Sequence, residues 1–320
     1  MSGAGKPCQR ITAATLGEFK HRGKKITCVT AYDYPTARVV DDAGVDVILV
    51  GDSLGMVILG YENTIPVTLS DMIHHAAAVV RGAKTALVVV DMPFLTCRLG
   101  PVEALRGAGR ILQETGAAAV KVEGGAEMAG VISALVEAGI PVMGHVGLTP
   151  QSVNVLGGYG VRGKALEEAR RIVEGALALE RAGVFSLVLE NVPEQLAALV
   201  SRRLAIPTIG IGASAACDGQ VLVFHDLLGI PGDFKPRFVK GYASIGKAMG
   251  EAVKAFRQEV ETGLFPGPEH VYRGEDDVFT RLEREFAEAV LEVEAGGGTD
   301  TGRGLAGYRA GGQDRGSGKG

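Results

Sequence analysis

The segment VDVILVGDS, residues 45–53, is an apolar run interrupted only by Asp46 and ending in Gly51, Asp52 and Ser53. A short apolar run bounded by glycine is typical of a strand buried on both faces. Parallel strands present functional side chains at their C-terminal ends. The segment therefore predicts a buried parallel strand with polar chemistry directly after it.

The same arrangement recurs along the chain at intervals of about thirty to fifty residues. The other examples are ALVVVDM (86–92) with Asp91, AAAVKVEGG (117–125) with Lys121 and Glu123, PVMGHVG (141–147) with His145, SLVLENV (186–192) with Glu190, and PTIGIGA (207–213) with Gly212. ITCVTAYD (26–33) and a candidate at 221–224 bring the expected strands to eight. We expect all of these polar groups to lie at one edge of a single sheet.

Helical patterns separate these strands, which favours an α/β fold of the (β/α)8 TIM barrel type. One such helix is expected over residues 70–83, with Ser70 as its N-cap. An open, doubly wound sheet is the competing architecture. Its ligand crevice usually draws on two or three strands, whereas polar residues here follow at least four.

We divide the chain into four regions. Residues 1–24 form an arm and a helix that caps one barrel end, 25–272 the catalytic barrel, 273–295 an amphipathic helix, and 296–320 a disordered glycine-rich tail. We expect the amphipathic helix to have a structural role, packing on the barrel or on a neighbouring subunit.

Composition excludes several classes of protein. Lys and Arg total 33 against 37 Asp and Glu, so the net charge is −4, which argues against a nucleic-acid partner. There is no apolar stretch long enough for a membrane span and no signal-peptide pattern. The four cysteines show no paired spacing, and a cytoplasmic location is the simplest expectation.

Three carboxylates, Asp52, Asp91 and Glu123, follow three successive strands. Buried together they would repel one another, and a divalent cation would relieve that repulsion. Oxygen ligands favour Mg²⁺, which usually keeps waters that substrate oxygens can replace. The alternative is that each carboxylate caps a helix or pairs with a cation such as Lys121.

Three further side chains have candidate catalytic roles. Lys121 lies two residues before Glu123 and points to the same side, so it could neutralise a substrate carboxylate or an enolate; an ion pair is its structural alternative. His145 could contact a substrate oxygen or be a hydrogen-bonded core residue. Glu190 follows an apolar run, and an apolar environment would make it a stronger base; a helix cap or an ion pair is the alternative.

The segment GYGVRGKA, residues 158–165, has the spacing of a phosphate-binding P-loop. Ala165 stands where that loop needs a Ser or Thr for Mg²⁺, and the segment does not follow a strand directly. We interpret it as a mobile loop over the barrel mouth.

Taken together, several ordered motifs resemble the ketopantoate hydroxymethyltransferase family. They are TAYDYPTA (30–37), VGDSLGM (50–56), VVVDMPF (88–94), VKVEGG (120–125), GHVGLTPQS (144–152), VLENVP (188–193) and GIGA (210–213) followed by CDGQVLVFHD (217–226). The resemblance covers about residues 10–272 and implies a barrel of the phosphoenolpyruvate/pyruvate-like superfamily. It also implies a homo-oligomer, a decamer by analogy.

What the resemblance implies chemically is Mg²⁺-dependent transfer of a hydroxymethyl group from 5,10-methylenetetrahydrofolate to 3-methyl-2-oxobutanoate in pantothenate biosynthesis. It assigns the metal to Asp52, Asp91 and Glu123, the oxo-acid contacts to Asp52, Ser53, Asp91, Lys121 and His145, and the catalytic base to Glu190. The chain extends past PGPEHVY (266–272), the usual ending, and has Ser214 where many relatives have glycine.

Two alternatives to this function come from different classes. The first is a Mg²⁺-dependent oxo-acid enzyme of the phosphoenolpyruvate mutase and isocitrate lyase group, but the KxCGH segment typical of that group is absent from the sequence. The second is a barrel that binds ligand without turnover. The presence of every expected catalytic residue argues against it.

Overall fold

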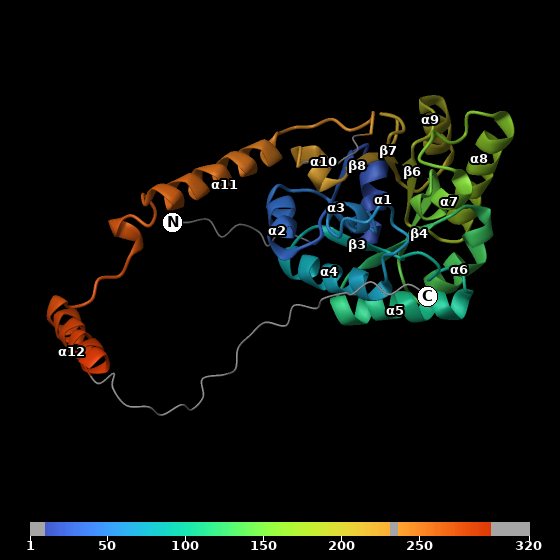
Figure 1. Cartoon of the computed structure of the whole chain (residues 1–320). Helices are drawn as coiled ribbons and strands as arrows, with labels where there is room; N and C mark the ends of the chain where they lie inside the picture. Colours follow the sequence, from blue (N-terminus) through green and yellow to red (C-terminus); the bar gives the residue numbers. More distant parts are fainter. Residues whose placement is uncertain (1–9, 231–235, 296–320) are drawn as a thin grey trace, which may run out of the picture. The chain divides into compact units, whose positions relative to one another are not determined.

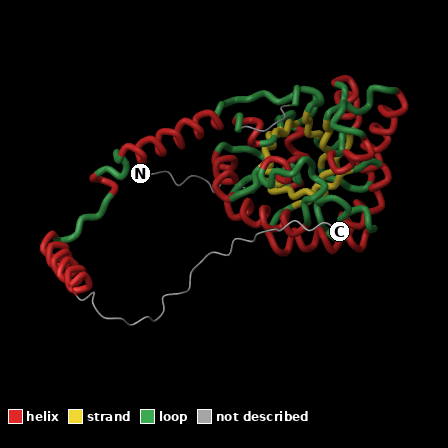
Figure 2. Tube along the Cα trace, in the orientation of Figure 1, coloured by secondary structure: helices red, strands yellow, loops and turns green. Residues whose placement is uncertain are grey.

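Eight parallel strands form a closed barrel in the computed structural model, which describes residues 10–230 and 236–295. The strands are β1 (Ile26–Thr30), β2 (Val47–Val50), β3 (Leu87–Asp91), β4 (Ala119–Glu123), β5 (Val142–Gly147), β6 (Ser186–Glu190), β7 (Thr208–Ile211) and β8 (Gly219–Leu222). Each pairs with the next, and β8 closes on β1 through Ile26 and Gly219. Figure 2 shows this ring of strands with helices around it. The predicted TIM barrel is confirmed.

Helices precede, connect and follow the strands, and several of the connecting helices lie around the outside of the ring (Figure 1). They are α1 (Ala13–His21), α2 (Tyr34–Asp42), α3 (Leu54–Val57), α4 (Leu69–Gly82), α5 (Pro101–Thr115), α6 (Ala129–Glu137), α7 (Val153–Leu156), α8 (Leu166–Arg181), α9 (Glu194–Arg203) and α10 (Phe224–Leu228), with the 3-10 turns η1 (Ala126–Met128) and η2 (Pro150–Ser152). No helix lies in the described connection between β7 and β8, residues 212–218.

Two hydrophobic clusters hold the barrel together. The larger one lies between the strands and their covering helices and includes Val88, Val120 and Leu187. The smaller one includes alternate strand residues such as Val89 and Met143 and fills the barrel interior. Leu16 of α1 belongs to this inner cluster and is fully buried. Helix α1 therefore packs against the barrel interior through Leu16.

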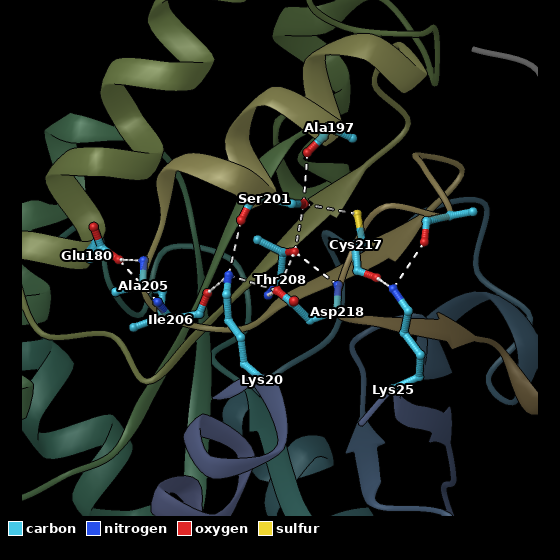
Figure 3. A network of polar contacts seen from close by, with 11 residues as sticks. Lys20, Lys25, Glu180, Ala197, Ser201, Ala205, Ile206, Thr208, Cys217 and Asp218 are labelled. Atoms are coloured by element: carbon cyan, nitrogen blue, oxygen red, sulfur yellow. Dashed lines mark hydrogen bonds and ion pairs between the residues drawn. The ribbon is translucent and has the colours of Figure 1, made fainter. Parts of the chain in front are cut away.

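A lysine ties α1 to the barrel wall (Figure 3). Lys20 Nζ donates to the carbonyl oxygens of Ser201, 3.1 Å away, and of Ile206, 2.8 Å away, and lies 3.0 Å from Asp218 Oδ2. Asp218 in turn accepts a hydrogen bond from the backbone N–H of Thr208 at the start of β7. These contacts fix the N-terminal end of the barrel, opposite the edge where the polar strand ends lie.

Two predicted boundaries were wrong by two residues each. Helix α4 is capped by Thr68 rather than Ser70, because Thr68 forms a reciprocal capping box with Asp71 while the third residue after Ser70 is an apolar isoleucine. Strand β8 is Gly219–Leu222 rather than 221–224. Its last pair is Leu222 with Val29, and the Phe224 N–H donates to Thr30 Oγ1 instead of continuing the ladder.

The chain divides into two compact units, residues 1–252 and 253–320. Helix α11 (Ile245–Thr262) crosses this boundary, and η3 (Pro268–His270) and α12 (Asp276–Ala295) follow. Phe279 and Phe286 on α12 are exposed. The predicted disordered tail, 296–320, lies outside the described residues. The predicted division at residue 272 stays a prediction.

Two further observations concern the described residues. Cys28, Cys97 and Cys217 are free thiols and are buried. Of the helices in 10–230 and 236–295, none has the length and hydropathy that crossing a bilayer requires.

Candidate active site

Strand alternation points the predicted site residues toward the barrel axis. Val89 and Asp91 of β3 have the same parity, as do Met143 and His145 of β5, and Val89 and Met143 belong to the inner cluster. The remaining members with this parity are Lys121 and Glu123 on β4 and Glu190 on β6. The register sets Asp91 beside Lys121, and Glu123 beside His145. The barrel interior is therefore polar at the C-terminal ends of the strands and apolar below them.

Asp52 and Asp91 form the acidic part of this layer, and both are buried. The Asp52 N–H donates to Asp91 Oδ2 over 3.1 Å. Gly51 leaves room for the Ser53 hydroxyl beside these acids, since a Cβ there would lie 2.8 Å from Ser53 Oγ. Burial, followed by the charges of Asp91 and Glu123, raises the pKa of Asp52 well above its usual value. The fold thus gathers negative charge that favours a cation.

The buried acids fit a magnesium ion only in part. Asp91 Oδ1 is buried without an aligned hydrogen bond, although Lys121 Nζ lies 3.2 Å away. Glu123, by contrast, accepts from the Gln151 N–H at 3.2 Å and lies 3.5 Å from His145 Nδ1. Within the part of the chain that the structure describes, three or more His, Cys, Asp or Glu side chains nowhere converge as a metal site. Mg²⁺ commonly binds one or two carboxylates and keeps its waters, which suits Asp52 and Asp91.

Lys121 is the buried cation of the site, with 4% of its side chain exposed. Burial lowers its pKa, but the surrounding carboxylates, led by Asp91 and Glu123, outweigh burial and hold the pKa above its usual value. The lysine is therefore charged. Its ammonium group also lies 3.1 Å from His145 Nδ1.

His145 lies between Lys121 and Glu190. Burial and Lys121 lower its pKa, while contacts with Glu123 and Glu190 raise it, to about 9 overall. A protonated imidazole would carry a proton on Nδ1 directly against the Lys121 ammonium. A pKa of about 9 corresponds to a protonated ring near neutral pH, but the 3.1 Å contact with Lys121 is a hydrogen bond only if Nδ1 accepts it. Because two buried cations this close would repel, we assign a neutral ring beside Lys121. The remaining ring proton is then on Nε2.

Glu190 faces that nitrogen, with Oε2 3.2 Å from His145 Nε2. The side chain is 18% exposed. The apolar residues of SLVL precede Glu190 along the strand, whereas the carboxylate itself lies beside His145 and is partly open to solvent. Glu190 remains reachable by a molecule entering the barrel mouth.

Ser53 is the N-cap residue of the short helix α3, and its Oγ lies 2.9 Å from the hydroxyl of Tyr32. Tyr32 is buried, and its carbonyl oxygen lies 2.6 Å from His75 Nδ1. The serine hydroxyl is thus held in place at the edge of the site next to Asp52.

Sequence reasoning did not assign a role to Gln151. Its Nε2 donates to Asp52 Oδ2 at 2.8 Å and to the carbonyl of Met92 at 2.9 Å, while its backbone N–H donates to Glu123. Gln151 lies in η2, beyond the end of β5, so the strand-end pattern could not reveal it. The only indication in the sequence was that Gln151 belongs to GHVGLTPQS, one of the motifs of the family resemblance.

Comparisons with known proteins identify the family of the chain. Residues 10–268 match the family model described as ketopantoate hydroxymethyltransferase. Two curated relatives are named 3-methyl-2-oxobutanoate hydroxymethyltransferase. The one from Acetivibrio thermocellus is 53% identical over 275 residues, covering 86% of this chain and 97% of its own length. The one from Enterococcus faecalis is 53% identical over 271 residues, covering 85% and 98%.

Solved structures with the same fold have much lower identity. A phosphonopyruvate hydrolase in complex with oxalate and Mg²⁺ has a TM-score of 0.54 at 12% identity, covering 88% of this chain and 98% of its own. A phosphoenolpyruvate phosphomutase from Streptomyces platensis subsp. rosaceus has a TM-score of 0.52 at 16% identity, covering 89% and 99%. At this level of identity these likenesses show the barrel fold alone. The family match and the curated relatives show more: this chain belongs to the ketopantoate hydroxymethyltransferase family, a family of transferase enzymes.

Proposed function

We propose that this enzyme transfers a hydroxymethyl group from 5,10-methylenetetrahydrofolate to 3-methyl-2-oxobutanoate, giving 2-dehydropantoate and tetrahydrofolate in pantothenate biosynthesis. One water is consumed and supplies the oxygen of the new hydroxyl. Family membership supports the reaction type. The observation that carries the residue roles is the contact series Asp91–Lys121–His145–Glu190, which links a buried charged cluster to a carboxylate open to the barrel mouth.

Glu190 is the proposed base, because it is the carboxylate of the site that a substrate can approach without displacing a buried ion pair. It takes the proton from C3 of the oxo acid, and the electron pair moves toward the ketone oxygen. His145 Nε2 lies 3.2 Å from Glu190 Oε2 without an aligned hydrogen bond in the free protein, and we expect it to contact the carboxylate during this transfer. C3 of the enolate then becomes bonded to the methylene carbon of the folate, and both C–N bonds of that carbon break in the course of the transfer. Water supplies the hydroxyl, and the two folate nitrogens take up the proton from C3 and one proton from water.

Asp52 and Asp91 would hold Mg²⁺ directly and Glu123 through water. When bound, the ion supplies Lewis-acid chemistry, drawing electron density from the carboxylate and ketone oxygens of the oxo acid and acidifying C3. Lys121 keeps a fixed positive charge beside Asp91 and limits the repulsion among the acids. Ser53, held by Tyr32, supplies a polar contact for the oxo acid. A cytoplasmic location and assembly into a homo-oligomer stay predictions.

A direct test incubates the full chain with 3-methyl-2-oxobutanoate, 5,10-methylenetetrahydrofolate and Mg²⁺ and measures 2-dehydropantoate. Exchange of the C3 proton in D₂O, measured without folate, isolates the proton transfer. We expect Glu190→Gln to abolish both, and a chelator to do the same in the wild type. The matched control is Glu194→Gln, the same change at an exposed glutamate four residues later, which retains both activities. Exchange that persists in Glu190→Gln, or that needs no divalent ion, contradicts the proposal.

A further inference from the structure

The connection between β5 and α8, residues 148–165, makes contacts on two sides of the barrel mouth. On one side Gln151 binds Asp52 after β2 and the Met92 carbonyl after β3. On the other side Asn191, directly after β6, donates from Nδ2 to the carbonyl oxygen of Tyr159 over 2.9 Å. Strands β2 and β6 are not neighbours in the ring. The connection therefore crosses the mouth above the charged layer.

The backbone conformation and hydrogen bonds of Asn191 fix this end of the connection. Its φ of 49° is in the left-handed region, which asparagine tolerates better than most residues. Its N–H donates to Ile211 at 2.8 Å, and its carbonyl accepts from the Arg162 N–H at 2.9 Å. The residue directly after the proposed base thus holds both Tyr159 and Arg162 through hydrogen bonds.

The Tyr159 side chain ends in a hydroxyl that lacks a partner. The oxygen is buried, yet within the described residues it makes no hydrogen bond. Such a group costs free energy unless something else satisfies it. Burial raises the pKa of this phenol, and the charges of Asp52 and then Glu190 raise it further. The hydroxyl therefore stays protonated and is within electrostatic reach of both carboxylates.

We propose that the Tyr159 hydroxyl donates a hydrogen bond to an oxygen of the oxo acid that lies between Asp52 and Glu190, making Tyr159 a further substrate-binding residue. Two observations support this. The Tyr159 hydroxyl is a buried donor without a hydrogen-bond partner among the described residues. The connection that carries it is hydrogen-bonded to Asp52 through Gln151 and to Asn191, the residue after Glu190. The assignment rests on the proposed function. With this assignment, the segment GYGVRGKA binds a carboxylate or enolate oxygen of the substrate. It does not bind phosphate, because Ala165 replaces the Ser or Thr that a P-loop needs.

Tyr159→Phe removes the hydroxyl and keeps the ring. Because the hydroxyl is unpaired in the free protein, its loss leaves the melting temperature unchanged or higher. With substrate bound, the variant loses a hydrogen bond to a charged oxygen, so we expect C3 proton exchange to slow about 10- to 100-fold. Tyr242→Phe, at an exposed tyrosine, is the matched control and keeps the wild-type exchange rate.

Asn191→Gly provides a second variant. Glycine adopts the positive φ without strain, so the change removes only the amide that holds Tyr159. We expect it to slow exchange in the same direction, with no further slowing when Tyr159→Phe is added, since both changes remove one interaction.

The outcomes separate this inference from the proposed function. Slow exchange in Tyr159→Phe with an unchanged melting temperature supports the inference. Unchanged exchange overturns it, and so does normal exchange combined with slow product formation, which would place the hydroxyl on the folate instead. If the wild-type protein shows no exchange with 3-methyl-2-oxobutanoate and Mg²⁺, the proposed function itself is wrong and this assignment falls with it.

Discussion

Replacing Lys121 with methionine removes the buried positive charge of the site and keeps most of the side-chain volume. Asp91, 3.2 Å from the ammonium, and Glu123, 3.8 Å away, would then be buried near Asp52 without a cation. Removing one partner of a buried ion pair costs about 3–5 kcal/mol. At roughly 2–4 °C per kcal/mol for a unit of this size, the melting temperature of the metal-free protein should fall by roughly 6–20 °C.

The assay is thermal unfolding in a chelator and again in excess Mg²⁺. The variant should gain more from Mg²⁺ than the wild type, because the added cation replaces lost positive charge. The pKa of Lys121 is raised in the folded protein, so its contribution is complete below the unfolded value of about 10.4 and is lost only as the pH rises through the folded pKa. The titration of Lys121 itself therefore adds no pH dependence below about pH 9, and any pH dependence of the difference there would come from Asp52, Asp91 and His145, whose pKa values Lys121 lowers.

Lys84→Met is the matched control, because Lys84 is exposed. Its melting temperature should stay within a degree or two of the wild type, since most surface substitutions change stability by less than about 0.5 kcal/mol. A similarly small change in Lys121→Met would refute the reasoning, because it would mean that the buried acids do not depend on this cation.

Two further predictions concern residues that support the barrel. Asp41 is buried and accepts hydrogen bonds from Lys84, Thr85 and Ala86; burial raises its pKa, but these bonds lower it below the usual value. Asp41→Asn should cost about 1–3 kcal/mol in urea unfolding near pH 7. The stabilisation exists above the unfolded pKa of about 3.9 and is lost as the pH falls through the folded pKa, so the difference should shrink below about pH 4; a pH-independent difference would contradict this. Gly147→Ala should lower both the melting temperature and the exchange rate, because φ is 101° and a Cβ would collide with the Glu190 carbonyl oxygen. Gly109→Ala, with open space around it, should stabilise the protein by about 0.5–1 kcal/mol, and equal effects of the two substitutions would argue against the steric explanation.

Much of the fold could be predicted because the strands have strong local signals. Runs such as ALVVVDM combine burial, β-branched residues and a polar end, and the closed ring follows from their number and spacing. Element ends were less predictable. Thr68 and Ser70 are both good caps, and only the partner three residues later distinguishes them.

The site was predictable to the extent that its residues belong to strands. Strand parity is a local property, and it places Asp91, Lys121, Glu123 and Glu190 on one side of the sheet. Gln151 and Tyr159 belong to an irregular connection whose path depends on distant contacts with Asp52 and Asn191. No periodicity in the sequence encodes that path, and the same holds for the His145 ring beside Glu190.

The crossing connection over the mouth has a consequence for protein engineering. The carboxylates come from the rigid barrel, whereas Gln151 and Tyr159 come from residues 148–165, whose short helix α7 carries the almost fully exposed Val155. The proposed catalytic carboxylates and the connection that crosses the barrel mouth are thus encoded in separate stretches of the gene. A library confined to the codons of 153–164 would vary the contacts proposed for the oxo acid, Tyr159 among them, without changing the barrel residues proposed as metal ligands and base.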